Sequence, residues 1–171
     1  MIALLPSVQK FCLYMVLVFV GLLAGMLFFH QMAPVETQLS PIEYAKYWKI
    51  VDGTFMHSRM AIMGPAVMIL FVVTLLVFVK KWKSLTFLFL ILSFIAFALD
   101  VGLTVTQQLP INEFINQLDL TNITESQTKQ LTAYQATSIS NFEIRFVLSL
   151  ISFLLLCLTP FFLPRLNKLT K

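Results

Sequence analysis

Charged residues are scarce in this sequence, and their scarcity excludes most soluble proteins. Of the 171 residues only 12% are charged, whereas 58% are hydrophobic and the mean hydropathy is +0.86. Soluble domains carry about 25% charged residues, so the composition indicates a membrane protein. The residue-by-residue alternation of a membrane β-barrel is also missing, which leaves α-helices as the elements that cross the bilayer.

Cysteine is equally scarce. The two cysteines, Cys12 and Cys157, lie in or beside apolar segments and form no CxxC motif. No disulfide framework follows from them, and the outer-loop cysteines of tetraspanins and claudins are absent. A quinone-linked thiol oxidoreductase would need paired cysteines at a membrane face. We therefore interpret both residues as small buried apolar side chains.

The sequence does contain four apolar runs, each about as long as a helix that crosses a bilayer. They cover about residues 11–29, 60–79, 85–106 and 142–163. The first run ends in Phe28-Phe29-His30-Gln31 and not in a cleavage site of small residues, so we expect a retained helix and not a signal peptide. The four runs predict an all-α integral membrane four-helix bundle that forms a single domain over residues 1–171.

Basic and acidic residues occupy opposite ends of these predicted spans. One end has basic residues and no acids: Lys10, Lys80, Lys81, Lys83, Arg165, Lys168 and Lys171. The other half has all eight acids: Glu36, Glu43, Asp52, Asp100, Glu113, Asp119, Glu125 and Glu143. By the positive-inside rule both termini are cytoplasmic, and the loops of about residues 30–59 and 107–141 lie outside. We expect a multi-pass protein of a bacterial inner membrane. Its expected partner is the lipid bilayer, and we expect no binding to nucleic acid.

The first outer loop has the pattern of a short helix. Ser40-Pro41-Ile42-Glu43 is a capping box with proline at the first helical position, and Gly53 is a helix-stop residue. Between them Tyr44, Trp48 and Val51 recur at helical spacing. We expect a short amphipathic helix that lies at the membrane surface or covers the bundle, with Trp48 as an interfacial anchor or a substrate contact.

The second outer loop follows Pro110, where we expect the third span to have ended. Apolar residues at positions 111, 114, 115 and 118 predict a short amphipathic helix that folds back onto the outer surface. Thr124 and Gln127 form a second capping box, which predicts another helix that runs toward Asn141.

Asp100 stands inside the third apolar run, where a charge costs about 3 kcal/mol. Asp100, Thr104 and Gln107 follow one another at i+4 and i+3 spacing, so one face of an α-helix would carry all three into the bundle. Arg145, near the outer end of the fourth span, is the predicted partner of Asp100. We expect the pair to form the floor of a polar pocket that opens outward. The alternative is that it serves only to fix the register of the two helices.

Polar residues from all four spans are expected at the same depth as this pair. In an enzyme His30 or His57 would act as general base, while Asp100 and Arg145 orient it or stabilise an enolate-like anion. Further candidate substrate contacts are Trp48, Thr104, Gln107, Asn112, Asn141 and Glu143.

Three short motifs resemble those of the anthrone oxygenase-like family of small four-helix membrane proteins, a domain of unknown function. They are Gly21-x-x-Ala24-Gly25-x-x-Phe28-Phe29 followed by Pro34, Thr104-x-x-x-x-Leu109-Pro110-Ile111-Asn112, and Asn141-x-x-x-Arg145. The resemblance implies a four-helix bundle. For fungal relatives it implies cofactor-independent oxygenation of anthrones to anthraquinones, hence an apolar phenolic or quinone-like substrate and no cofactor.

Two other functions fit the same residues. A non-catalytic protein could bind a lipid or small ligand in the bundle, or serve as an accessory subunit through its outer loops. A non-haem iron, zinc or copper ion could be held by His30, His57 and one of Asp100 or Glu143, although no HExxH or comparably spaced motif is present.

Overall fold

The computed structural model describes the backbone of residues 5–53 and 57–163, and the side chains of residues 7–53 and 62–163. Every regular element in these ranges is helical. Four helices are long and apolar enough to cross a membrane, which confirms the prediction of an all-α protein with four membrane-length helices. They are α1 (Leu5–Met32), α3 (His57–Phe78), α4 (Leu85–Leu103) and α6 (Glu125–Leu158).

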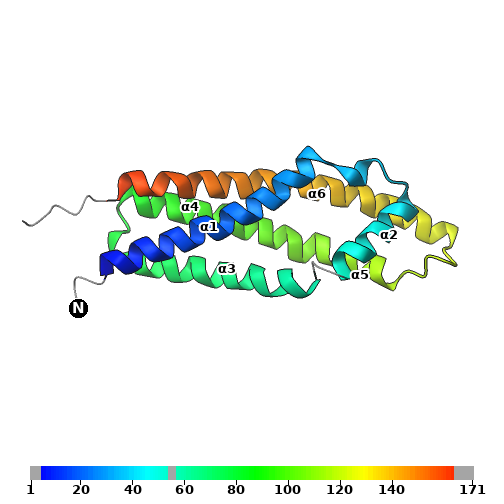
Figure 1. Cartoon of the computed structure of the whole chain (residues 1–171), viewed down its shortest axis with the longest axis horizontal. Helices are drawn as coiled ribbons and strands as arrows, with labels where there is room; N and C mark the ends of the chain where they lie inside the picture. Colours follow the sequence, from blue (N-terminus) through cyan, green and yellow to red (C-terminus); the bar gives the residue numbers. More distant parts are fainter. Residues whose placement is uncertain (1–4, 54–56, 164–171) are drawn as a thin grey trace, which may run out of the picture.

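The four long helices lie side by side along the length of the molecule (Figure 1). α1 begins and α6 ends at the same end of the bundle, where the 3-10 turn η3 (Val79–Lys81) joins α3 to α4. At the opposite end α2 (Pro41–Val51) and α5 (Leu109–Gln117) lie beside the first turns of α6. We call α2, α5 and residues 125–140 of α6 the cap. Two further 3-10 turns, η1 (Val35–Thr37) and η5 (Thr159–Phe162), follow α1 and α6.

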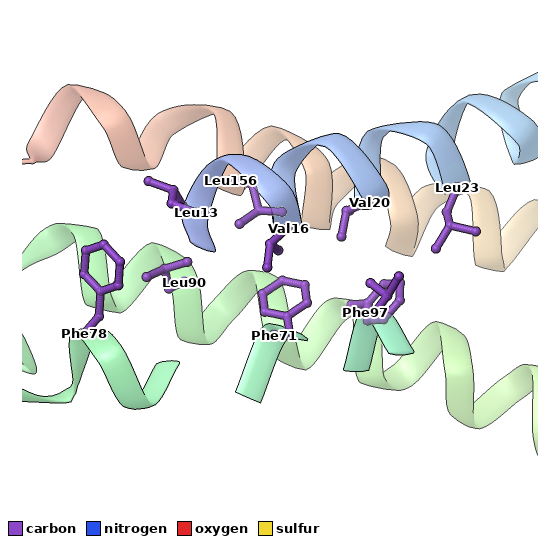
Figure 2. Close-up of a cluster of buried hydrophobic side chains, with 10 residues drawn as sticks. Leu13, Val16, Val20, Leu23, Phe71, Phe78, Leu90, Phe97 and Leu156 are labelled. Atoms are coloured by element: carbon purple, nitrogen blue, oxygen red, sulfur yellow. The ribbon is translucent and has the colours of Figure 1, made fainter. Parts of the chain in front are cut away.

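One cluster of apolar side chains packs the bundle between its two ends. On α1 the buried residues Leu13, Val16 and Val20 recur every three or four positions, as expected for one face of a helix. Figure 2 shows them gathered opposite Phe71 of α3 and Phe97 of α4. Because lipid tails are as apolar as these side chains, close packing and not the exclusion of water holds this region together.

α6 approaches both α1 and α4 closely. A Cβ added to Gly21 of α1 would lie 2.8 Å from Cε2 of Phe153, so glycine permits this contact. On the other side Ser93 of α4 donates from Oγ to the Ser152 carbonyl at 2.8 Å, and Ser152 Oγ donates to the Ser93 carbonyl at 3.0 Å. Hydrogen bonds between membrane helices contribute about 0.6 kcal/mol each, and this reciprocal pair fixes the rotation of α4 against α6.

A second apolar cluster fills the cap. The predicted capping box of α2 is present: the Ser40 N–H donates to Glu43 Oε2 at 2.9 Å, and Ser40 Oγ accepts from the Glu43 N–H at 3.4 Å. Ser40 Oγ also donates to Glu43 Oε2 at 2.6 Å, and this bond, together with the one from the Ser40 N–H, lowers the pKa of the Glu43 carboxyl. Tyr44 and Trp48 are almost completely buried in this cluster. The face of α2 that carries them, as predicted, therefore packs on the bundle. Burial raises the pKa of the Tyr44 hydroxyl well above its usual range.

The predicted end of the third span at Pro110 is wrong. The helix runs on from Leu85 to Gln117, through α4, a π-helical turn η4 (Thr104–Gln108) and α5. In the π-turn the Leu109 N–H donates to the Thr104 carbonyl, five residues back. Pro110 follows in the first turn of α5, directly after the π-turn, and does not end the helix. The amphipathic segment 111–118 therefore extends the third span and does not fold back.

The predicted boundary between a capped helix and the fourth span is also absent, because both belong to α6. The Thr124 capping box begins this helix, with the Gln127 N–H donating to Thr124 Oγ1 at 3.3 Å. Its 34 residues correspond to about 51 Å at the helical rise, against a hydrocarbon core of about 30 Å. One rigid element therefore joins the cap to the rest of the bundle.

Candidate functional site

The predicted pairing of Asp100 with Arg145 is confirmed. Arg145 Nε donates to Asp100 Oδ1 at 2.7 Å, and Ser149 Oγ donates to Oδ2 at 3.4 Å. The exposed fractions of the two charged side chains are 12% for Arg145 and 7% for Asp100. The pair joins α4 to α6. Because both side chains are buried, removing one of them would leave the other as an unpaired buried charge.

The serine pair below explains why these two charges meet. Asp100 lies seven residues after Ser93 and Arg145 lies seven residues before Ser152, so each is two turns from the serine contact. α4 and α6 run in opposite directions (Figure 1), and two turns along one helix therefore reach the same level as two turns back along the other. The reciprocal serine contact thus sets the register in which Asp100 faces Arg145.

The prediction that Gln107 shares the inward face with Asp100 is wrong, because Gln107 is exposed while Gln108 is 3% exposed. A regular α-helix turns by about 100° per residue and would place Gln107 about 20°, and Gln108 about 80°, from Asp100. The extra residue of the π-turn shifts the following residues by about 100°. Gln108 therefore comes within about 20° of Asp100, and Gln107 turns outward.

A network of amides continues from Gln108 into the cap. Gln108 Nε2 donates to Asn112 Oδ1 at 2.9 Å, and Ser138 Oγ donates to Gln108 Oε1 at 3.1 Å. Asn112 Nδ2 donates to Asp52 Oδ1 at 3.3 Å, and Asn116 Nδ2 donates to Asp52 Oδ2 at 2.6 Å. These bonds tie Asp52, which follows α2, to α5, and they tie the π-turn η4 to α6.

Beside the ion pair and the amides lies a cavity of about 700 Å³. Five predicted site residues line it: Trp48, Asp100, Thr104, Asn112 and Arg145. Sequence reasoning missed four polar residues of its wall: Asp52, Gln108, Glu113 and Asn116. Two of them, Gln108 and Asn116, belong to an i+4 series with Asp100, Thr104 and Asn112. This series is visible in the sequence, but it indicates a common face only once the π-turn is known. The remaining walls are mostly apolar, and α3 contributes Gly64, Pro65, Met68 and Ile69.

Arg145 has donors to spare at the edge of this cavity. Only its Nε forms a hydrogen bond with the described residues, and Cζ lies 5.5 Å from the centre of the Phe142 ring. A guanidinium carries five N–H donors, so the four on the two Nη atoms are uncommitted among the described residues. The Trp48 Nε1–H, also buried, has no acceptor there.

His30 lies apart from the large cavity. Its ring stacks on Phe142 with centroids 4.8 Å apart, and Nδ1 lies 3.0 Å from Glu36 Oε1, a carboxylate that sequence reasoning did not assign to the site. His30 and Glu36 line a second space of about 40 Å³, which holds a few water molecules at most. Phe142 lines both spaces and stacks on Trp48 at 5.5 Å.

The remaining predicted residues take different positions. The side chain of His57 lies outside the described residues. Glu143 is exposed beside the small space of His30, and Asn141 is buried, with no partner for Nδ2 among the described residues. In the ranges that the structure describes, no group of three His, Cys, Asp or Glu side chains could hold a metal ion. The metal hypothesis therefore gains no support from His30, Asp100 and Glu143.

No protein-family model, curated protein sequence or solved structure matches this chain. The resemblance to anthrone oxygenase-like proteins thus rests on its three sequence motifs, and any function has to be argued from the cavity itself.

Proposed function

We propose that this membrane protein binds an apolar small molecule with an oxygen-bearing head group in the cavity of about 700 Å³. The observation that carries the proposal is Arg145, which lines this cavity, pairs with Asp100 through Nε alone, and has both Nη groups uncommitted among the described residues. Ligand pockets commonly measure about 300–1,000 Å³ and place a few polar groups in largely apolar walls.

The alternative role of the pair, fixing the helix register, explains less. A purely structural buried ion pair is most stable when every donor is satisfied and packing encloses it. Arg145 instead lines a cavity and has Nη donors that are unused among the described residues. A ligand oxygen there would accept charge-assisted hydrogen bonds from the Nη groups. The rings of Trp48, Phe97 and Phe142 line the same cavity and would contact the apolar body of the ligand.

The proposed orientation puts the cap outside. Lys80 and Lys81 belong to η3, at the end where α1 begins and α6 ends, and Lys10 lies in the early part of α1. By the positive-inside rule this end faces the cytoplasm, so α2 and α5 lie on the extracytoplasmic side. The cavity then occupies the outer half of the bundle, in a plasma membrane such as a bacterial inner membrane.

A second candidate function is cofactor-independent oxygenation of a phenolic or quinone-like molecule. The observation in its favour is that three aromatic rings and the Asp100 carboxylate line one cavity. A base that removes a proton from an anthrone-type carbon leaves a carbanion, which reacts with dioxygen and a proton to give a hydroperoxide; loss of water then leaves the quinone carbonyl. His30 lines the smaller space and not this cavity. Asp100 would therefore be the base itself or would orient another base. Oxygen consumption with emodin anthrone, abolished by Asp100→Asn, would support this function; an unchanged rate would exclude it.

Binding can be measured through Trp48. The chain has two tryptophans, and replacing the exposed Trp82 by Phe leaves Trp48, on the cavity wall, as the single reporter. Menadione, a naphthoquinone with carbonyl oxygens, should quench its fluorescence saturably in detergent. A double variant, Asp100→Asn with Arg145→Gln, removes both charges without leaving one unpaired. We expect its Kd to rise at least about tenfold, because a hydrogen bond to a charged group contributes about 1.5–3 kcal/mol.

The chain offers a matched control on the same helix. Glu125 and Lys129 form an exposed ion pair 2.9 Å apart, so Glu125→Gln with Lys129→Gln also removes two opposite charges and should leave the Kd unchanged. Saturable quenching that is equal in all three proteins would show that Arg145 does not hold the head group. Absence of saturable quenching in the Trp82→Phe protein, with menadione and with a brominated stearic acid, would refute the proposed function.

A further inference from the structure

The cavity reaches the side of the bundle between α3 and the π-turn. Three of its lining residues have large exposed fractions as well: 65% for Ile69 of α3, 55% for Val105 of η4 and 39% for Leu109 of α5. Side chains that line a cavity and are also exposed stand at its border. All three are aliphatic, so this border is apolar.

The apolar border lies below the level at which α3 enters the membrane. α3 begins at His57 and its expected span begins at about residue 60, so Ile69 comes about nine residues further on, about 14 Å along the helix. An opening at this depth meets lipid chains and not water. Toward the cap the lining becomes polar, with Glu113 and Asn116 of α5. The border is therefore polar near the cap and apolar further along α3. A bilayer changes in the same way, from polar at its surface to apolar in its interior.

The wall of α3 leaves room beside this border. Gly64 lines the cavity, and a Cβ added there would meet no atom within 4 Å. On the cap side, in contrast, Trp48 is 1% exposed and the Asp52 carboxylate is fixed by the amides of Asn112 and Asn116. Movement of a ligand past α3 breaks none of these hydrogen bonds, whereas passage through the cap would.

We infer that the cavity is loaded sideways from the bilayer, between Ile69 of α3 and Val105 of η4, by an amphiphile dissolved in the membrane. This inference rests on the proposed function, and it specifies the ligand class. The head group carries an oxygen acceptor, a carbonyl or a carboxylate, which Arg145 binds. The tail is an apolar chain or ring system that extends past Ile69 toward the lipid.

The route can be tested without altering the binding groups. Ile69→Phe with Val105→Phe narrows the border, and both positions are exposed enough to accept the larger ring. The matched control is Ile95→Phe with Leu99→Phe on α4, two aliphatic residues of 50% and 55% exposure that do not line the cavity. All proteins carry Trp82→Phe and are placed in lipid nanodiscs. Trp48 is then quenched by brominated stearic acid supplied within the bilayer, and both the rate and the final extent are recorded.

We expect the border variant to be quenched at least about tenfold more slowly than its parent, because the narrowed border slows entry, while the control keeps the parental rate. Equal rates in the border variant, the control and the parent, together with saturable quenching in each, would overturn sideways loading and leave the proposed function standing. Absence of quenching in the parent, both here and with menadione in detergent, would instead refute the proposed function and the inference with it.

Discussion

Arg145 holds Asp100 through a single 2.7 Å hydrogen bond from Nε, so the carboxylate fixes the guanidinium without using its two Nη groups. Side-on pairing of this kind keeps both charges buried and leaves one edge of the guanidinium turned to other acceptors. One residue pair therefore has two roles: it joins α4 to α6, and it holds Arg145 in place for the proposed binding of a ligand.

Removing one partner of this pair should destabilise the protein more than removing both. Arg145→Gln leaves Asp100 buried without its counter-ion, and we expect a loss of about 3–5 kcal/mol in the free energy of unfolding. The double variant with Asp100→Asn should lose less, because no lone charge remains. Unfolding in detergent measures the difference, and Glu125→Gln, at an exposed pair, should cost about 0–1 kcal/mol. A double variant less stable than Arg145→Gln would contradict this account.

Gln107 and Gln108 are adjacent and identical, so they test the π-turn directly. Gln108→Ala removes hydrogen bonds to Asn112 and Ser138, and we expect a loss of about 1–3 kcal/mol in the free energy of unfolding. Gln107→Ala changes an exposed residue and should stay within about 0.5 kcal/mol of the parent. The reverse order of stabilities would mean that the helix keeps regular α geometry through this segment.

Filling the cavity from α3 should weaken binding without unfolding the protein. Gly64→Leu places a side chain where a Cβ meets no atom within 4 Å, and leucine is also the better helix former. Menadione affinity, measured through Trp48, should fall at least about tenfold while the melting temperature is kept or raised. Gly102→Leu is the control, since Gly102 has equally open space but does not line the cavity. Unchanged affinity in Gly64→Leu would place the ligand elsewhere.

The proposed orientation predicts which residues a membrane-impermeant maleimide reaches from outside. In a chain with Cys12→Ala and Cys157→Ala, Thr121→Cys lies in the exposed turn between α5 and α6 and should be labelled in intact cells. Lys83→Cys lies in the turn between α3 and α4 and should be labelled only after lysis. The opposite pattern would invert the topology, and it would place the cavity in the cytoplasmic half.

The sequence alone determined the class of the protein and the presence of its central ion pair. Four apolar runs are enough to specify membrane helices, because the bilayer requires each span to satisfy its own backbone. A carboxylate and a guanidinium within these runs predict a partnership, because an isolated charge there is too costly. Capping boxes at Ser40 and Thr124 likewise fixed two helix starts from local hydrogen bonds.

Only the tertiary structure decided which polar residues share the site. A π-turn adds one residue to a helical turn, and this single residue exchanged Gln107 for Gln108 on the inner face. Asp52 and Asn116 meet across 64 positions of sequence, so no local pattern relates them. His30 shares the predicted depth of Asp100 but packs on the ring of Phe142 and lines the smaller space. Depth in the membrane follows from sequence, whereas rotation about each helix axis follows from packing against its neighbours.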